Sequence, residues 1–411
     1  MATTEIASSE ADPTSDKTSM DGSLEAAIES AIEAVQESEA PTPVRTTSGP
    51  RILMIRKLSD IVVLPAGRIS ANERALTADI ILQVLGKVEK ELRIEVAQRV
   101  ARVPECPPAL TRMLLLDEPD VAAPILTGAE GVPEALIIEC AREGTTAHRT
   151  MIARRIDLTT SLADVLVSFN EPEVAKILLR LDDFTLSPNA VELLVSRSVS
   201  DVEMQNLLLR RRELEPVHGF MMFWWVKGER RRRILSRYAL DRSIIQEALQ
   251  DLFPMVFRDK SNPDELVKNI LTMTDRRHRP RGANGEAVSM EAVKRTVDYA
   301  RRNPVQEVVD AVGMVAGISS ELAARIIRDP GGEPYAVMCK SLGISRDDFF
   351  ASLRSGDESE QMSADEADDI LAVFDSMARD FSRAVLRYWD WDGNPRIARI
   401  MGLLGLDEDI L

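Results

Sequence analysis

Apolar residues recur three or four positions apart through most of residues 70–255, which predicts a succession of short amphipathic helices. Three segments share a pattern: "PDVAAPIL" (119–126), "PEVAKILL" (172–179) and "SDVEMQNLLL" (200–209). Each begins with a turn-type residue, an acid and a valine, and has an aliphatic residue five positions after that valine. Intervals of 53 and 28 residues separate Val121, Val174 and Val202, and the longer interval fits two units.

The repetition predicts helical pairs of 25–29 residues that follow one another along the chain. A single pair cannot bury its apolar face alone, whereas stacked pairs share a continuous core. We therefore expect an all-α fold, with HEAT-like short helical repeats that form an α-solenoid and a further helical region after it. A globular helical bundle is the alternative, because imperfect repeats arise easily in helices rich in Leu and Ala.

Local signals predict where several of these helices begin. Ser70 and Glu73 form a capping-box pattern that opens a helix to about Leu85. Ser187 can cap a helix whose first residue is Pro188. A second capping box at residues 363–366 predicts one long helix that reaches toward residue 389. The single strand candidate is "DIVVLP" (60–65), and it is short.

Composition divides the chain into four parts. We expect a disordered acidic tail at residues 1–50, because Ser, Thr, Pro, Glu and Ala predominate there. A HEAT-like repeat domain follows at 51–258, a basic loop or linker at 259–287, and a C-terminal helical region at 288–411. The tail contains one segment with helical periodicity, in which four apolar residues share one face: Leu24, Ile28, Ile32 and Val35. It is either a transient helix or a segment that docks onto a partner or onto the body of the protein.

The net charge of -16 is unevenly distributed along the chain. Residues 1–50 hold ten acidic and two basic residues, and residues 357–369 hold seven acidic residues and no basic one. The remainder of the chain is close to neutral, so the acidity says little about what the folded surface binds.

The sequence contains no motif for a cofactor or a metal ion. Three cysteines, Cys106, Cys140 and Cys339, are too few and too scattered for a disulfide framework or a zinc site. Gly-rich phosphate loops, nucleophile elbows and paired-histidine metal motifs are absent from the sequence. No signal-peptide pattern and no apolar run of about 20 residues is present, so we expect a cytoplasmic protein that is not an enzyme.

Several motifs resemble a bacterial family named domain of unknown function 2336. They are "LPAGRISANERALTADIILQVL", "PPALTRMLLLDEPDVAAPIL", "AHRTMIARRIDLTTSLADVLV" and "EPEVAKILLR". The resemblance covers roughly residues 50–350 and implies an all-helical, repeat-containing body. It implies no reaction, because the family has no catalytic motif to carry over. The aromatic and basic stretch described next is similar to a Phe/Trp-rich helix followed by an Arg-containing helix in that family.

The stretch "HGFMMFWWVKGERRRR" (218–233) is the most unusual passage of the chain. Phe220, Phe223 and Trp224 are spaced as on a buried helix face, and Trp225 is the aromatic that we expect to stay partly exposed. Gly228 is expected to make a turn, after which the arginines begin a second helix and face solvent. Aromatic residues beside arginines also suit a helix at a membrane surface, so that alternative stays open.

Residues 210–237 carry nine basic and three acidic residues, which predicts a basic patch that binds phosphate or an acidic peptide. The candidate binding residues are Arg210, Arg211, Arg212, Trp225, Arg230, Arg231, Arg232, Arg233 and Arg237. The alternative is a solvated face whose arginines pair with nearby glutamates. We expect a non-catalytic scaffold or adaptor that binds another protein. A nucleic-acid-binding protein and a peripheral membrane protein are the alternatives, and the sequence indicates no small-molecule substrate.

Overall fold

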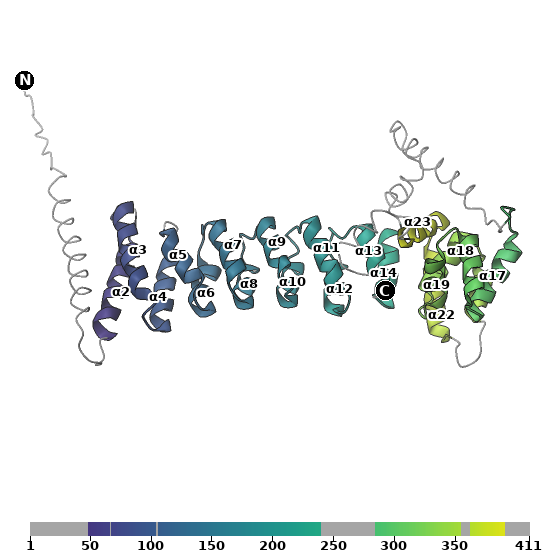
Figure 1. Ribbon diagram of the computed structural model, residues 1–411, viewed down its shortest axis with the longest axis horizontal. Coiled ribbons are helices and arrows are strands. Elements are labelled where there is room, and N and C mark those ends of the chain that lie inside the picture. Colours follow the sequence, from purple (N-terminus) through teal and green to yellow (C-terminus); the bar gives the residue numbers. More distant parts are fainter. Residues whose placement is uncertain (1–47, 66, 104–105, 240–283, 355–361, 391–411) are drawn as a thin grey trace, which may run out of the picture. The chain divides into compact units, whose positions relative to one another are not determined.

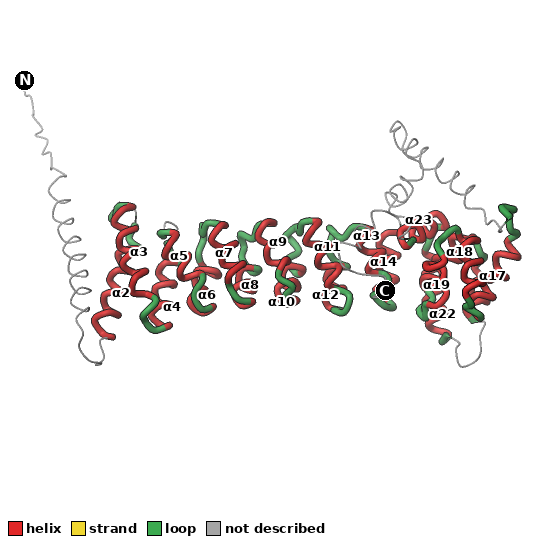
Figure 2. Tube along the Cα trace, viewed as in Figure 1, coloured by secondary structure: helices red, strands yellow, loops and turns green. Residues whose placement is uncertain are grey.

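A computed structural model describes residues 48–65, 67–103, 106–239, 284–354 and 362–390. Every regular element within these ranges is an α-helix, as Figure 2 shows, so the predicted fold class is confirmed. The predicted disordered tail lies outside the described residues except for residues 48–50, which begin the first described helix. Only residues 284–287 of the predicted basic loop are described.

The chain divides into two compact units, residues 1–166 and 167–411. The first unit consists of α2 (Ser48–Val62), α3 (Ala71–Leu85), α4 (Lys90–Val100), α5 (Pro108–Leu115), α6 (Pro119–Gly128), α7 (Glu134–Glu143), α8 (Thr146–Ile152) and most of α9 (Thr160–Ser168). Helices α2, α4, α6 and α8 pack on one another in chain order, and α3, α5 and α7 form a parallel row beside them (Figure 1). These two rows of helical hairpins are consistent with the predicted α-solenoid.

The second unit begins with the same arrangement in α10 (Pro172–Leu179), α11 (Pro188–Arg197), α12 (Val202–Leu208), α13 (Pro216–Met222) and α14 (Glu229–Tyr238). Helix α10 packs on α12, and α11 packs on α13. A C-terminal bundle follows: α17 (Met290–Arg302), α18 (Gln306–Ala316), α19 (Ser320–Arg328), α20 (Glu333–Leu342), α21 (Arg346–Leu353), α22 (Ala364–Ser376) and α23 (Arg379–Trp389). Helix α20 is almost wholly buried, because α22 and α23 both pack on it.

The second helices of successive hairpins share one pattern of burial. When α6, α8, α10 and α12 are each numbered from their first residue, positions 3, 4, 7 and 8 are buried, and position 9 is exposed. Helix α14 follows the same pattern at positions 4, 7 and 8 when Gly228 is counted as position 1. This spacing gives each helix one apolar stripe that faces its hairpin partner and its neighbours.

Most of the predicted helix starts are confirmed. Ser70 and Glu73 form the capping box that opens α3, and the Ser187 side chain accepts the Ala190 N–H beside Pro188. Ser363 and Glu366 form a second capping box, but the helix that it opens ends at Ser376. The prediction of one long helix to residue 389 is wrong.

The break between α22 and α23 is the buried residue Met377, whose backbone is extended. The turn that it makes lets both helices pack on α20. The strand candidate at residues 60–65 is also wrong, because its first three residues are the last three of α2. In α2 the buried residues Ile55, Leu58 and Val62 are spaced for a helix face.

Candidate interaction surface

The aromatic residues of the 218–233 stretch lie in the interior of the second unit, where α13 meets the C-terminal bundle. The Phe220 ring lies 5.1 Å from the Tyr388 ring and 5.4 Å from the Tyr238 ring, centroid to centroid. The Phe223 ring lies 4.6 Å from the Trp389 ring. Both phenylalanines are fully buried, so the expectation of a buried helix face is confirmed for them.

Trp224 and Trp225 are each half-buried, so the partial exposure expected of Trp225 is shared by its neighbour. Trp224 packs against Trp389, with 5.0 Å between ring centroids, and the Arg325 guanidinium lies over its ring. Trp225 Nε1 donates to Ser198 Oγ over 3.4 Å. These contacts engage the tryptophans within the protein, which reduces the apolar area that they offer to a membrane.

Gly219 of α13 allows the Tyr238 ring of α14 to approach the α13 backbone closely. A Cβ atom at Gly219 would lie 2.5 Å from the ring of Tyr238, whose hydroxyl donates to Leu214 O. Helices α13 and α14 therefore cross at a point where only a glycine fits. We refer to the contacts of α13 and α14 with the C-terminal bundle as the seam.

Arg231 is the charged residue at the centre of the seam, and only 7% of it is exposed. Its Nε donates to Phe223 O and Val226 O, at 3.1 and 3.0 Å. Its two Nη atoms donate to the two Asp329 carboxylate oxygens, at 2.8 Å each, and Nη1 also donates to Glu333 Oε2 at 3.2 Å. The expectation that this arginine faces solvent is wrong.

The electrostatics of this cluster follow from its burial. Burial alone would lower the pKa of Arg231, but the hydrogen bonds and charges of Asp329 and Glu333 together outweigh that effect and raise it. Burial raises the pKa of Glu333, and the nearby guanidinium only partly offsets this. The cluster therefore holds one permanent cation between two carboxyl groups. Removal of the Arg231 guanidinium would leave both carboxyl groups buried without a counter-charge.

The position of Arg231 is occupied by polar residues with the same role in three other second helices. Position 4 of α4, α8 and α12 is Arg93, Arg149 and Gln205. Like Arg231, each side chain donates to carbonyls at the turn between the two helices of its hairpin. Arg93 donates to Val88 O, Arg149 to Ala141 O and Gly144 O, and Gln205 to Ser198 O and Val199 O. The last carbonyls of a helix lack intrahelical partners, so a buried or half-buried donor at position 4 stabilises each turn.

Position 10 has a second recurring role. Arg155, Arg211 and Arg237 occupy it in α8, α12 and α14, and each donates to carbonyls at the end of the preceding second helix. The acceptors are Ile125 O, Leu126 O and Ala129 O for Arg155; Leu181 O and Phe184 O for Arg211; and Leu209 O, Arg211 O and Leu214 O for Arg237. Arg211 is 5% exposed and also bonds Glu213. Two further candidate residues, Arg211 and Arg237, thus join adjacent hairpins.

The other predicted binding residues do not gather into one patch. Arg210 and Arg212 are exposed at the end of α12, and Arg237 in the last turn of α14 reaches this region. Arg230, which is half-buried, and Arg233, which is exposed, lie in the first turns of α14, and Arg232 there forms an ion pair with Asp369 of α22. Because α14 has ten residues, about 15 Å separates its two ends, and the arginines form two groups.

The outward face of α10 and α12 is a better-defined surface. Half-buried Ile177 and Leu207, each at position 6, form its apolar centre, and Val202 is 51% exposed beside them. Lys176 Nζ lies 3.0 Å from Asp201 Oδ2 and 3.3 Å from Glu203 Oε2. Arginines occupy position 9 of both helices, Arg180 and Arg210, and Arg180 also pairs with Glu203.

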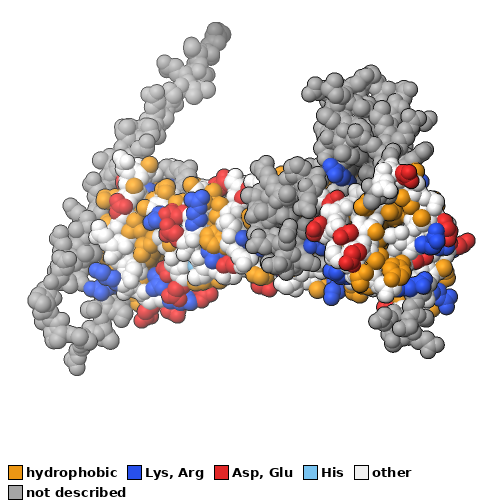
Figure 3. Space-filling model, turned by 45° about the vertical axis from the view of Figure 1, so that its right-hand side comes forward, with side chains coloured by type: hydrophobic (Ala, Val, Ile, Leu, Met, Phe, Trp, Pro, Cys, Tyr) orange, Lys and Arg blue, Asp and Glu red, His pale blue; other side chains and the backbone are white. Residues whose placement is uncertain are grey.

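This outward face carries acidic residues as well as the arginines, since position 2 of α10 and α12 is Glu173 and Glu203. The hydrogen bond from Lys176 and then that from Arg180 lower the pKa of Glu203, which is therefore ionised at neutral pH. Figure 3 likewise shows acidic and basic side chains next to one another on the described part of the face that it presents.

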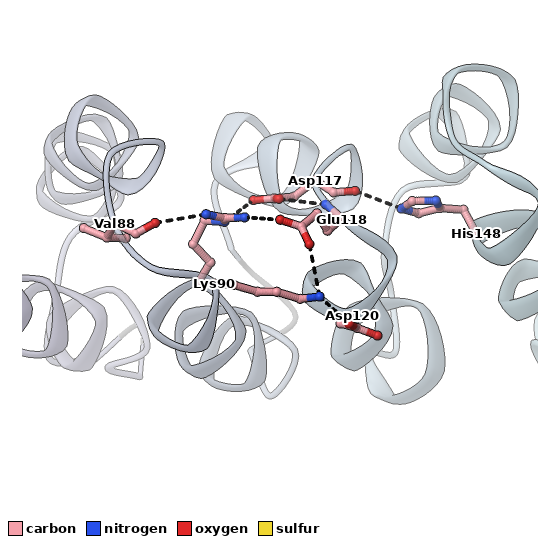
Figure 4. A network of polar contacts seen from close by, with 7 residues as sticks. Val88, Lys90, Asp117, Glu118, Asp120 and His148 are labelled. Atoms are coloured by element: carbon pink, nitrogen blue, oxygen red, sulfur yellow. Dashed lines mark hydrogen bonds and ion pairs between the residues drawn. The ribbon is translucent and has the colours of Figure 1, made fainter.

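In the first unit, ion pairs and a histidine connect the turns of adjacent hairpins (Figure 4). Arg93 Nε lies 2.9 Å from Asp117 Oδ2, and Lys90 Nζ lies 3.0 Å from Glu118 Oε2. His148 Nε2 lies 3.0 Å from Asp117 O, and His148 Nδ1 lies 3.1 Å from the Thr145 backbone nitrogen.

These contacts define the protonation state of His148. Nδ1 accepts the Thr145 N–H, so Nε2 carries the proton that is donated to the carbonyl of Asp117. Burial lowers the pKa of His148, and the adjacent Arg149 adds to this, although the hydrogen bond to Asp117 opposes it. His148 is therefore a neutral residue that caps α8 and links it to the preceding hairpin.

The described residues contain no group of three or more His, Cys, Asp or Glu side chains placed to hold a metal ion. In the same ranges, no helix is long and apolar enough to cross a membrane. One small cavity of about 80 Å³ lies between α18 and α23, where Arg383 and Arg387 line it together with Asp390.

The sequence alone did not identify Asp329, Glu333 or Trp389 as partners of the 218–233 stretch. Asp329 and Glu333 lie 98 and 102 residues from Arg231, and Trp389 lies farther still from Phe223, so no local signal marks these contacts. The available signal was the repeat register, because Arg231 falls at the buried position already occupied by Arg149. Only an alignment of the repeats by their buried positions would have indicated an internal role.

The family model described as "Uncharacterised protein conserved in bacteria (DUF2336)" matches residues 121–387. This range begins later and ends later than the resemblance predicted from sequence, and it excludes the motif at 64–85. It covers α6 to α23 up to Arg387, and therefore includes the outward face of α10 and α12 and the seam except for Tyr388 and Trp389. No curated protein and no solved structure matches the chain.

Proposed function

The chain belongs to the bacterial family domain of unknown function 2336, and we propose that it is a non-catalytic helical-repeat scaffold that binds another protein. The binding surface in this proposal is the outward face of α10 and α12. The partner is a protein segment with apolar side chains that cover Ile177 and Leu207. Charged groups of that segment would then meet the acidic residues on one side and Arg180 and Arg210 on the other.

One observation carries the proposal: successive second helices present the same outward positions. An apolar side chain stands at the centre of α10 and again at the centre of α12, between a glutamate near the N-terminal end and an arginine near the C-terminal end. A surface with a repeated apolar row and charged borders suits an extended or helical protein segment, whose side chains also recur at regular intervals.

A protein partner is favoured over nucleic acid by the roles of the arginines. Arg211, Arg231 and Arg237 donate to backbone carbonyls, and Arg232 pairs with Asp369, so fewer cations are left for phosphate groups. Glu173 and Glu203 on the outward face would repel a phosphate backbone. The burial of Phe220 and Phe223 similarly argues against a membrane-surface role.

A cytoplasmic location is part of the same proposal. Cys106, Cys140 and Cys339 are all free thiols, and burial raises the pKa of Cys140 to about 12. Unpaired cysteines are typical of proteins in a reducing compartment. Their burial also makes Cys140 and Cys339 poor nucleophiles, which agrees with a non-catalytic role.

Site-specific photocrosslinking of the full-length chain in its native host tests this proposal. A crosslinking residue replaces Leu207 on the proposed surface or, as a matched control, Leu193 on α11, which is 36% exposed. We expect a discrete protein adduct from position 207 that is lost in the Arg210→Glu variant, and none from position 193. Equal crosslinking at both positions, or nucleic acid as the adduct at 207, would contradict the proposal.

A further inference from the structure

Helix α2, the first described helix of the stack, has one side that no described helix covers. Helix α2 packs on α3 and on α4, whereas α4 is packed between α2 and α6. The side of α2 that a preceding hairpin would cover carries Leu53, which is 57% exposed, and half-buried Met54 and Ile61. The ends of a helical stack need a cover, because the apolar side of a terminal hairpin otherwise faces water.

The chain itself contains a segment with the matching pattern just before α2. Leu24, Ile28, Ile32 and Val35 fall at spacings of four, four and three residues, which places them on one face of a helix. Glutamates at 25, 29 and 33 follow the same four-residue spacing beside them. This is one apolar stripe with an acidic border, and its length is similar to that of α2.

The charges of the two elements are complementary. The first ten residues of α2 contain Arg51, Arg56 and Lys57 and no acidic residue. Lys57 is exposed, and it lies four residues from Leu53 on the same helix face. Arg56 is already held by Glu95 of α4, with both hydrogen bonds at 2.8 Å, so Lys57 is the cation beside the apolar side of α2.

The connection is long enough for the segment to return along α2. Twelve residues, 36–47, join it to Ser48, and twelve extended residues span about 40 Å. Helix α2 has 15 residues and is therefore about 22 Å long. The segment can thus reach every part of the uncovered side.

We propose that residues 24–35 dock on the uncovered side of α2 in the same chain and act as the N-terminal cap of the helical stack. Leu24, Ile28, Ile32 and Val35 contact Leu53, Met54 and Ile61, and the glutamates face Lys57. The inference is independent of the proposed partner surface, which lies in the second unit. It assigns a function to a segment whose composition alone indicates no folded structure.

Hydrogen–deuterium exchange of the full-length chain, measured by mass spectrometry, tests the cap. The Ile28→Asp/Ile32→Asp variant removes the apolar face, and Ser30→Asp adds an acid on the opposite face as the matched control. We expect roughly tenfold faster exchange of residues 24–35 and of α2 in the double variant, and wild-type exchange in the control. The reciprocal variant Leu53→Asp should accelerate exchange of residues 24–35 while peptides from α6 stay unchanged.

Two results would overturn the proposal. The first is equal exchange of α2 in the wild type and in the Ile28→Asp/Ile32→Asp variant. The second is protection of residues 24–35 that depends on protein concentration, because the segment would then bind a second copy rather than its own chain. Neither result would alter the outcome of crosslinking at position 207, so the two proposals fail independently.

Discussion

The α4–α8 stack of the first unit and the seam of the second unit are both built from packed helices, but they use charged side chains differently. In the stack, Lys90 forms ion pairs at the surface with Glu118 and Asp120 of the next hairpin. In the seam, Arg231 is buried among aromatic residues and bonds two carboxyl groups and two carbonyls. The comparison shows that the repeat position of an arginine, rather than its place in a basic run, decides its role.

The physical consequence is a large difference in what each residue contributes. Ion pairs at the surface contribute little, because water screens the charges and long side chains lose entropy on pairing. Removing one partner of a buried pair is costly, because the remaining charge stays in a medium that solvates it poorly. Variants of the two regions should therefore differ strongly in the free energy of unfolding.

The largest effect is expected for Arg231→Met. The substitution keeps an unbranched apolar side chain but leaves Asp329 and Glu333 buried without a cation, so the free energy of unfolding should fall by about 3–5 kcal/mol. Urea unfolding followed by circular dichroism measures this loss. Arg233→Met, two residues further and exposed, is the matched control and should change stability by less than about 0.5 kcal/mol. Similar losses in the two variants would contradict the assignment.

A smaller loss is expected for Arg211→Ala. Its guanidinium donates to Leu181 O and Phe184 O, and these carbonyls would lose a charged donor. We expect about 1.5–3 kcal/mol of destabilisation, whereas Arg212→Ala, which is exposed, should be nearly neutral. The same unfolding assay compares the two. If Arg212→Ala proved the more destabilising variant, position 10 would not have the role assigned to it.

His148 predicts a pH dependence in the first unit. The folded protein holds this histidine neutral with a pKa below its ordinary 6.5, so the unfolded chain binds more protons as the pH falls. The stabilisation is complete above about pH 6.5 and is lost as the pH decreases toward the folded-state pKa. Melting temperatures at pH 7.5 and 5.5 should therefore differ more for the wild type than for His148→Gln. An equal difference in both proteins would argue against the neutral cap.

The smallest effect is expected for Lys90→Met. Its ammonium group pairs with Glu118 and Asp120 at the surface of the stack (Figure 4). The melting temperature should shift only slightly, and the shift should diminish further in high salt because of screening. A loss comparable to that of Arg231→Met would erase the distinction between the stack and the seam.

Much of the fold could be predicted from the sequence because helical periodicity and capping are local. Ser70, Ser187 and Ser363 each cap a helix through contacts within three residues. The break at Met377 could not be predicted in the same way, since no Pro or Gly marks it. It arises because α22 and α23 both pack on α20, which is a tertiary effect.

The candidate site was less predictable, because an unbroken run of arginines gives no indication of which members are buried. Arg231 and Arg233 look equivalent in the sequence, yet the helix turns by about 200° between them. The buried partner of Arg231 comes from a helix about a hundred residues further along the chain. Only the repeat register distinguishes these two arginines before a structure is known.

The most direct test of this account is the solvent exchange of individual arginine side chains in the full-length protein. Nitrogen-15 NMR of the guanidinium Nε–H groups, with each signal assigned by an Arg→Lys variant, reports how each group is held. We predict slow exchange for Arg211, Arg231 and Arg237, and fast exchange for Arg210, Arg212 and Arg233. Fast exchange of all six would contradict the claim that repeat position separates internal arginines from those on the surface.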